Sequence, residues 1–175
     1  MLKQKKAGNK RKKIRNRIKA KNGLFKLFGI NCAGIKSKIT TFNEVLKRVQ
    51  PKIWTLQETK LKNNESISCE ALGSYQVYYR NRQESQGGGI ALGVDKDLKS
   101  TLVKEGENDT EAISVKVSLK DIELRVITAY GPQENDLKVK KENFWEFIEE
   151  EIINAELAGE GVIVQMDGNL HAGRE

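Results

Sequence analysis

The sequence predicts an α/β fold with a mixed sheet, and two observations carry this prediction. Residues 24–57 contain, in order, a strand-like, a helix-like and a strand-like segment, which is typical of a parallel βαβ unit. The middle of the chain instead contains strand-like segments separated by short turns, which is typical of antiparallel hairpins. The length of 175 residues suits one domain with a hydrophobic core, which we assign to residues 23–175, after a basic tail at residues 1–22.

The predicted βαβ unit begins with the apolar segment at residues 24–31. A helix is predicted over residues 37–49, because apolar side chains recur there at helical spacing: Ile39, Phe42, Leu46 and Val49. Ser37 is the predicted N-cap of this helix, and Pro51 follows its end. The apolar run at residues 53–57 is then the second, buried strand of the unit.

The middle of the chain is predicted to form hairpins. Its strand-like segments are rich in aromatic and β-branched residues or alternate between apolar and polar residues: 75–80, 89–94, 113–119 and 122–129. Lys120 and Asp121 form a predicted tight turn between the last two segments. The run Gly87–Gly89 lacks the Gly-Lys-Ser/Thr continuation of a phosphate-binding loop, so we interpret it as a hairpin turn with close backbone packing.

The last third of the chain is predicted to contain a long helix and a buried strand. The helix covers residues 139–157, because apolar side chains recur there four residues apart: Phe144, Ile148 and Ile152. Gly159 and Gly161 follow its end. The apolar run Val162–Val164 predicts a strand that is buried on both faces.

The positive charge of the chain is concentrated in the tail. The net charge is +7, yet residues 1–22 hold eleven Lys or Arg and no acidic residue, which leaves 20 basic and 24 acidic side chains for the rest. Such a tail suits a polyanion, above all nucleic acid. We expect its contacts to come from the densest part: Lys10, Arg11, Lys12, Lys13, Arg15 and Arg17. A nuclear localisation signal and a passive solvated arm are the other interpretations.

The remaining signals favour an intracellular, nuclear protein. A structural zinc site needs about four Cys or His ligands in close groups, and the chain has only Cys32, Cys69 and His171, far apart in the sequence. We expect the two thiols to be reduced. The tail lacks the apolar stretch of a signal peptide. No apolar run approaches the roughly 20 residues that cross a bilayer, so we expect no membrane contact.

Polar side chains follow four of the predicted strands, at the point where each strand ends: Asn31, Glu58, Tyr130 and Asp167. Taken singly, each is an ordinary surface or turn residue. Because parallel strands bring their C-terminal ends to one edge of a sheet, we expect the four side chains to converge there, with Asn169 nearby. Carboxylates and amide oxygens in small number suit Mg²⁺ or Mn²⁺, with substrate phosphate oxygens completing the coordination.

One residue and four short motifs follow one another along the chain: Asn31, Leu-Gln-Glu-Thr at 56–59, Gly-Gly-Gly-Ile-Ala at 87–91, Tyr-Gly-Pro at 130–132 and Asp-Gly-Asn at 167–169. This order resembles the endonuclease/exonuclease/phosphatase superfamily, and within it most of all the endonuclease domains of non-LTR retrotransposons. The resemblance spans about residues 25–171. It implies a divalent-metal-dependent phosphodiester hydrolase on a two-sheet α/β sandwich, with nucleic acid, foremost DNA, as the substrate.

The resemblance also implies a role for each of these residues. Glu58 would bind the divalent metal, and Asn31 would shape the metal-binding end of the site. Tyr130 would contact the scissile phosphate. Asp167 would orient or deprotonate the attacking water, and Asn169 would donate a hydrogen bond to the phosphate.

The chain departs from the family pattern in two places. First, family members have the motif Gly-Asp-Phe-Asn, where this chain has Met-Asp-Gly-Asn at 166–169. Second, the family sequences continue to a late Asp and a Ser-Asp-His motif, whereas this chain stops at Glu175. His171 lies too close to Asn169 to be that histidine. We therefore expect a sandwich incomplete at its C-terminus, with an apolar face of the strands at 111–129 exposed, poor solubility, and activity near the detection limit.

Two other functions remain open on the sequence alone. One keeps the fold but changes the substrate, as in a phosphatase acting on inositol phosphates or lipids, or a sphingomyelinase. The other is a non-catalytic remnant that binds nucleic acid through its tail. The basic tail favours a nucleic-acid partner over a lipid one.

Overall fold

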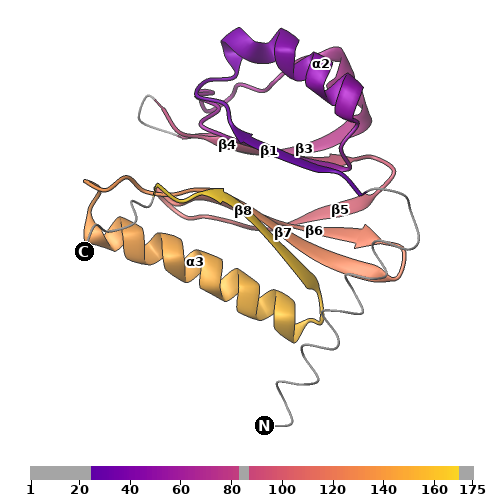
Figure 1. Cartoon of the computed structure of the whole chain (residues 1–175). Coiled ribbons are helices and arrows are strands. Elements are labelled where there is room, and N and C mark those ends of the chain that lie inside the picture. The colour runs from indigo at the N-terminus through magenta and orange to yellow at the C-terminus, as the bar shows by residue number, and fades with distance from the viewer. Residues whose placement is uncertain (1–24, 83–86, 170–175) are drawn as a thin grey trace, which may run out of the picture.

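The computed structural model describes residues 25–82 and 87–169 (Figure 1). The basic tail, with the predicted nucleic-acid contacts from Lys10 to Arg17, lies outside the described residues, as does His171. In the two described ranges, no helix is both long enough and apolar enough to cross a membrane.

Two four-stranded sheets form the centre of the molecule. The first has the order β1-β2-β4-β3, and its strands in that order are Leu27–Asn31, Ile53–Gln57, Ile90–Asp95 and Tyr75–Arg80. The second has the order β5-β6-β7-β8, and its strands are Lys99–Glu105, Glu111–Leu119, Ile122–Tyr130 and Gly161–Asp167. Strands β1 and β2 are parallel, as are β7 and β8, and the other neighbours are antiparallel. The predicted mixed-sheet sandwich is confirmed, with one parallel pair in each sheet.

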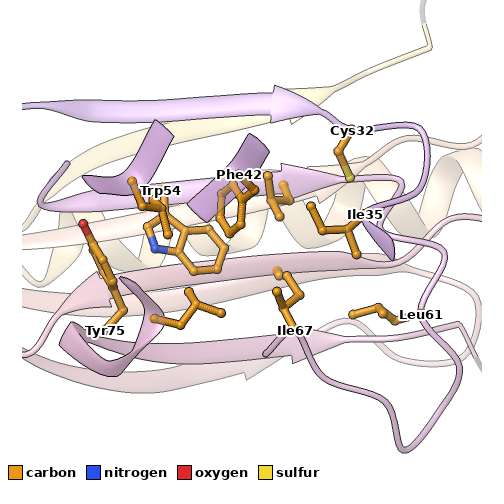
Figure 2. Close-up of a cluster of buried hydrophobic side chains, with 11 residues drawn as sticks. Cys32, Ile35, Phe42, Trp54, Leu61, Ile67 and Tyr75 are labelled. Carbon is orange, nitrogen blue, oxygen red and sulfur yellow. The ribbon is translucent and has the colours of Figure 1, made fainter. Parts of the chain in front are cut away.

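The sheets pack face to face, and one helix covers the outer face of each (Figure 1). Between the sheets lies a core of aliphatic side chains from β2, β4, β6 and β7, among them Ile53, Leu92, Val115 and Val126. Helix α2 (Ile39–Val49) packs on the first sheet through the cluster of Figure 2, which includes Phe42, Leu46, Trp54 and Tyr75. Helix α3 (Lys138–Leu157) packs on the second sheet through Phe144, Phe147 and Ile148. These apolar contacts fix the two sheets and therefore the ends of their strands.

The start of α2 differs from the prediction. A short 3₁₀ turn, Lys36–Lys38, precedes the helix, and the N-cap is Lys38, which makes no side-chain capping bond. Ser37 as N-cap is therefore wrong. The physical reason lies upstream, because the N–H groups of Gly34 and Ile35 already donate to carbonyl groups after β2, so the chain turns before Ser37. The end of α2 follows the prediction, with Gln50 in the left-handed conformation directly before Pro51.

The apolar surface lies on different strands from those predicted. The strands at 111–129 are largely buried, so the prediction that they expose an apolar face is wrong. Val162–Val164 is not buried on both faces either, since Val164 is 37% exposed. The reason is position, because β8 and β1 are edge strands of their sheets. Ile30 of β1 is likewise 49% exposed.

Strands β1 and β8 face each other across the sandwich. Gly29 of β1 lies so close to Gln165 of β8 that a Cβ atom at position 29 would overlap the Gln165 side-chain amide. At their C-terminal ends, Asn31 and Asp167 are hydrogen-bonded. The two parallel pairs of strands therefore end at the same edge of the sandwich, although they belong to different sheets.

Candidate active site

Asn31 joins two carboxylates at the edge where the parallel strands end. Its side-chain nitrogen donates to Glu58 Oε1 and to Asp167 Oδ2, each at 2.7 Å. Its side-chain oxygen accepts the N–H of Ala33 at 3.0 Å, which fixes which side of the amide faces the carboxylates. One carboxylate follows β2 of the first sheet and the other ends β8 of the second, so Asn31 holds the two sheets together at this point.

The Glu58 carboxylate receives further polar contacts. The Tyr130 hydroxyl donates to Glu58 Oε1 at 3.0 Å, and the Lys60 ammonium lies 3.7 Å from Glu58 Oε2. The hydrogen bond from Asn31, supported by the hydrogen bond from Tyr130 and the positive charge of Lys60, lowers the pKa of Glu58 below its ordinary value. Burial raises the pKa of the Tyr130 phenol. At neutral pH the site therefore contains an ionised Glu58 and a protonated Tyr130.

The segment after β8 is folded back against the segment after β7. The N–H of Asn169 donates to Asp167 Oδ1 at 3.2 Å, and its side-chain nitrogen donates to the Gly131 carbonyl at 2.7 Å. The N–H of Gly131 in turn donates to the Asp167 carbonyl at 2.7 Å. Asn169 thus lies beside the site, where it fixes the turn that carries Asp167.

Several non-glycine residues at this edge have left-handed backbone conformations: Ala33 at φ +44°, Glu58 at +53°, Lys60 at +53° and Asn169 at +47°. Left-handed residues other than glycine are uncommon, and they cluster where the surrounding structure holds a functional group in place. Four of them lie at the edge where the site residues gather, and two of the four, Glu58 and Asn169, are themselves site residues.

A buried polar contact lies directly beneath the site. Gln57, the last residue of β2, donates from its side chain to the hydroxyl of Thr128 on β7 at 3.1 Å. Both side chains are almost fully buried between the sheets. This bond fixes the distance between the residue before Glu58 and the strand that ends in Tyr130.

The donor set suits a hard divalent cation that keeps most of its water. Within residues 25–82 and 87–169, no group of three or more His, Cys, Asp and Glu side chains is arranged to hold a metal. Two carboxylates held by one amide are present instead, and Mg²⁺ is usually bound by one or two carboxylates together with waters and substrate phosphates. Glu58 and Asp167 would hold such an ion, while the amide nitrogen of Asn31 faces them as a donor.

The structure brings together four of the side chains singled out in the sequence, those of Asn31, Glu58, Tyr130 and Asp167, and places Asn169 beside them; the chemical roles of all five remain predictions. Sequence reasoning missed three features of the site. It missed the ion pair of Lys60, the bridge from Gln57 to Thr128, and the contacts of the Gly87–Gly89 turn with the Glu58 segment. Lys60 and Gln57 flank the glutamate in the Leu-Gln-Glu-Thr-Lys motif, so their position was a usable signal.

Comparison with known proteins identifies the fold. No family model matches the chain, and no curated protein sequence matches it. Solved structures do: TDP2 from Caenorhabditis elegans superposes with a TM-score of 0.63 at 15% identity, over 90% of this chain and 53% of that one. The 3′ phosphatase NExo from Neisseria, bound to a product DNA hairpin, gives 0.61 at 18% identity, over 86% and 60%.

A third similar structure is the endonuclease domain of TRAS1, a telomere-specific non-LTR retrotransposon, with a TM-score of 0.59 and 14% identity, over 85% of this chain and 61% of that one. The chain thus spans between half and two thirds of the length of these three structures. At such low identity the similarity concerns the fold. The two mixed sheets with their covering helices form an α/β sandwich of the endonuclease/exonuclease/phosphatase type.

Proposed function

We propose that the chain carries the metal-binding end of a divalent-metal-dependent phosphodiester hydrolase that acts on nucleic acid, foremost DNA. The observation that carries this proposal is the placement of Glu58 and Asp167 on one amide group, at the edge of this fold where both parallel strand pairs end. Mg²⁺ or Mn²⁺ is the cation that this oxygen donor set favours.

The contacts of each site residue suggest its role in the proposed reaction. A bound cation would polarise a phosphoryl oxygen and stabilise the leaving alkoxide. Glu58 is ionised at neutral pH and supplies negative charge for the cation. Tyr130 keeps its proton, so its hydroxyl, which donates to Glu58 in the free site, can turn and donate to a phosphate oxygen of the substrate. Asp167 orients or deprotonates the attacking water, and Asn169 fixes the turn that holds Asp167.

Two observations support nucleic acid as the substrate class. The tail carries eleven Lys or Arg in 22 residues without an acid, which suits a phosphate backbone. Two of the similar structures are a phosphatase bound to a DNA hairpin and a retrotransposon endonuclease domain. A hydrolase of the same fold on a non-nucleic phosphate ester, and a non-catalytic nucleic-acid-binding remnant, are the alternatives that the experiments below separate.

The first test measures the affinity of the chain for a divalent cation. We expect Mn²⁺ to bind the purified chain, to be displaced by Mg²⁺, and to bind Glu58→Gln at least about tenfold more weakly, since even loss of an outer-shell partner costs about 10-fold. Electron paramagnetic resonance of free Mn²⁺ measures this affinity. Glu65→Gln is the matched control, because Glu65 is a partly exposed glutamate that pairs with Lys36 and not with the site residues. Equal Mn²⁺ affinity in both variants and the parent chain would remove Glu58 from a metal site.

Nicking of supercoiled plasmid with Mg²⁺ tests the reaction itself. We expect a rate close to the detection limit, because these 175 residues contain no Ser-Asp-His motif of the kind that the family resemblance implies, and a general acid/base group contributes ~10²–10⁴ in rate. Any nicking should disappear in Asp167→Asn. Strong nicking that survives both Asp167→Asn and Glu58→Gln would place the reaction elsewhere.

A further inference from the structure

Glu111 is a buried carboxylate close to the candidate active site, and none of the roles above uses it. It is the first residue of β6, is 4% exposed, and pairs in register with Tyr130 of β7. Its carboxylate accepts the N–H of Gly89 and forms an ion pair with Arg82. A charged group this deeply buried is costly unless its contacts compensate, so its partners indicate what it holds in place.

One of those partners, Gly89, belongs to the Gly87–Gly89 turn. All three glycines have positive φ, at +107°, +61° and +83°. A Cβ atom at Gly88 would overlap the Glu111 carboxylate oxygens, and one at Gly89 would lie 2.6 Å from the hydroxyl of Thr59. The turn is therefore built around the carboxylate on one side and packed against the segment after Glu58 on the other.

The same turn forms hydrogen bonds to the segment that carries Glu58. The N–H of Thr59 donates to the Gly89 carbonyl at 3.0 Å, and the N–H of Lys60 donates to the Gly88 carbonyl at 2.8 Å. On the opposite side, the Glu58 carbonyl accepts the N–H of Gly34 at 2.7 Å. Glu58 and Lys60 are left-handed, so this short segment needs both sets of bonds to keep a conformation that it would not adopt alone.

We propose that Glu111 is a positioning residue that, through the Gly87–Gly89 turn, holds Glu58 in the conformation in which its carboxylate lies beside Asp167. The connection is continuous: the Glu111 carboxylate binds the N–H of Gly89, and the carbonyls of Gly88 and Gly89 bind the two residues after Glu58. Its importance for metal binding rests on the function proposed above, whereas its effect on the backbone does not.

The first experiment follows the backbone alone, by hydrogen exchange of the full chain. In Glu111→Ala, the amides of Thr59 and Lys60 should exchange about tenfold faster or more, because hydrogen bonds to a charged group contribute at least that factor. The amide of Leu92, in the centre of β4, reports general loss of stability. The control is Glu160→Ala, which removes another buried carboxylate, paired with Arg125. Equal acceleration at Thr59, Lys60 and Leu92 would overturn the proposal, because Glu111 would then stabilise the fold in general.

The second experiment measures Mn²⁺ affinity of the same variants. We expect Glu111→Ala to weaken Mn²⁺ about tenfold, as loss of an outer-shell partner does, and Glu160→Ala to leave it unchanged. Glu111→Gln keeps an acceptor for the Gly89 N–H and should lie between Glu111→Ala and the parent chain, which keeps the test usable if Glu111→Ala does not fold. If Glu58→Gln binds Mn²⁺ normally, the proposed function fails and hydrogen exchange still decides the role of Glu111. If Glu58→Gln weakens Mn²⁺ but Glu111→Ala does not, Glu111 does not position the metal ligand.

Discussion

The Asn31 side chain arranges the two carboxylates of the candidate site. Its amide nitrogen donates to two carboxylates that would otherwise repel each other, and its oxygen is occupied by the Ala33 N–H. Because the amide nitrogen can only donate, Asn31 brings one oxygen of each carboxylate to the same point. The pKa of Glu58 is lowered chiefly by this hydrogen bond.

The first prediction at the residue scale concerns pH. The folded chain binds the Glu58 proton less tightly than the unfolded chain, so the ionised carboxylate stabilises the fold above its ordinary pKa of 4.5, and this stabilisation is lost as the pH falls through the lower, folded value. Asn31→Ala should move the titration midpoint of Glu58 upward, as followed by carboxyl ¹³C NMR. Asn43→Ala, which removes an asparagine that binds the Ala71 N–H away from the site, should leave the midpoint unchanged. An unshifted midpoint in Asn31→Ala would contradict the geometry.

At the scale of elements, a buried ionic cluster attaches α3 to the second sheet. Arg125 of β7 donates to Glu151 of α3 at 2.6 Å and to Glu160, in the turn before β8, at 2.9 and 3.0 Å. All three side chains are buried. The cluster lies at the start of β8, at the opposite end of that strand from Asp167.

Removing the guanidinium of this cluster leaves the buried Glu151 carboxylate without its cation, and the buried Glu160 carboxylate with only the Lys116 ammonium, 3.1 Å away. Arg125→Ala should lower the free energy of unfolding by ~3–5 kcal/mol, measured by urea denaturation, as breaking a buried ion pair does. Lys47→Ala removes an ion pair of similar length, to Glu70, on the surface of α2, and should have no measurable effect. A small change in Arg125→Ala would mean that the two carboxylates relax into solvent.

The elements also show what the sequence could and could not reveal. Strands β2, β6 and β7 were predicted to within two residues, because they are apolar runs or alternate regularly. Strand β5, Lys-Ser-Thr-Leu-Val-Lys-Glu, was missed, since an edge strand with one solvated side carries little apolar pattern. The ends of the predicted strands identified four of the five site residues, and the fifth, Asn169, follows Asp167 by two positions. The contacts of Glu111 were not predictable, because they join residues that no local pattern relates.

For the whole molecule, charge separates the chain into two parts. The tail carries +11 and the remaining chain has four more acidic than basic residues. Because the body is mildly acidic, we infer that sequence-independent affinity for nucleic acid comes from residues 1–22.

Deletion of residues 1–22 tests this inference. With the tail, the logarithm of the DNA association constant should fall steeply with the logarithm of salt concentration, by ~0.9 for each phosphate contact. Without it, both affinity and slope should decrease, as measured by fluorescence anisotropy with labelled duplex DNA. The control is a double variant, Lys138→Gln with Lys141→Gln, which removes two cations from the body. It should change the DNA affinity and the salt slope by no more than a small amount. Affinity and slope unchanged after the deletion would assign DNA binding to the body.

The hydrogen bond from Asn31 to Asp167 joins residues 136 positions apart, and β8 is the last strand of the described chain. Contacts between such distant residues require closure of a long loop, so they form late in folding. During synthesis, Asn31 and Glu58 leave the ribosome long before Asp167 exists, and the two sheets must assemble first. The proposed cation site would therefore form only with the finished sandwich, and metal ions would not guide its early folding.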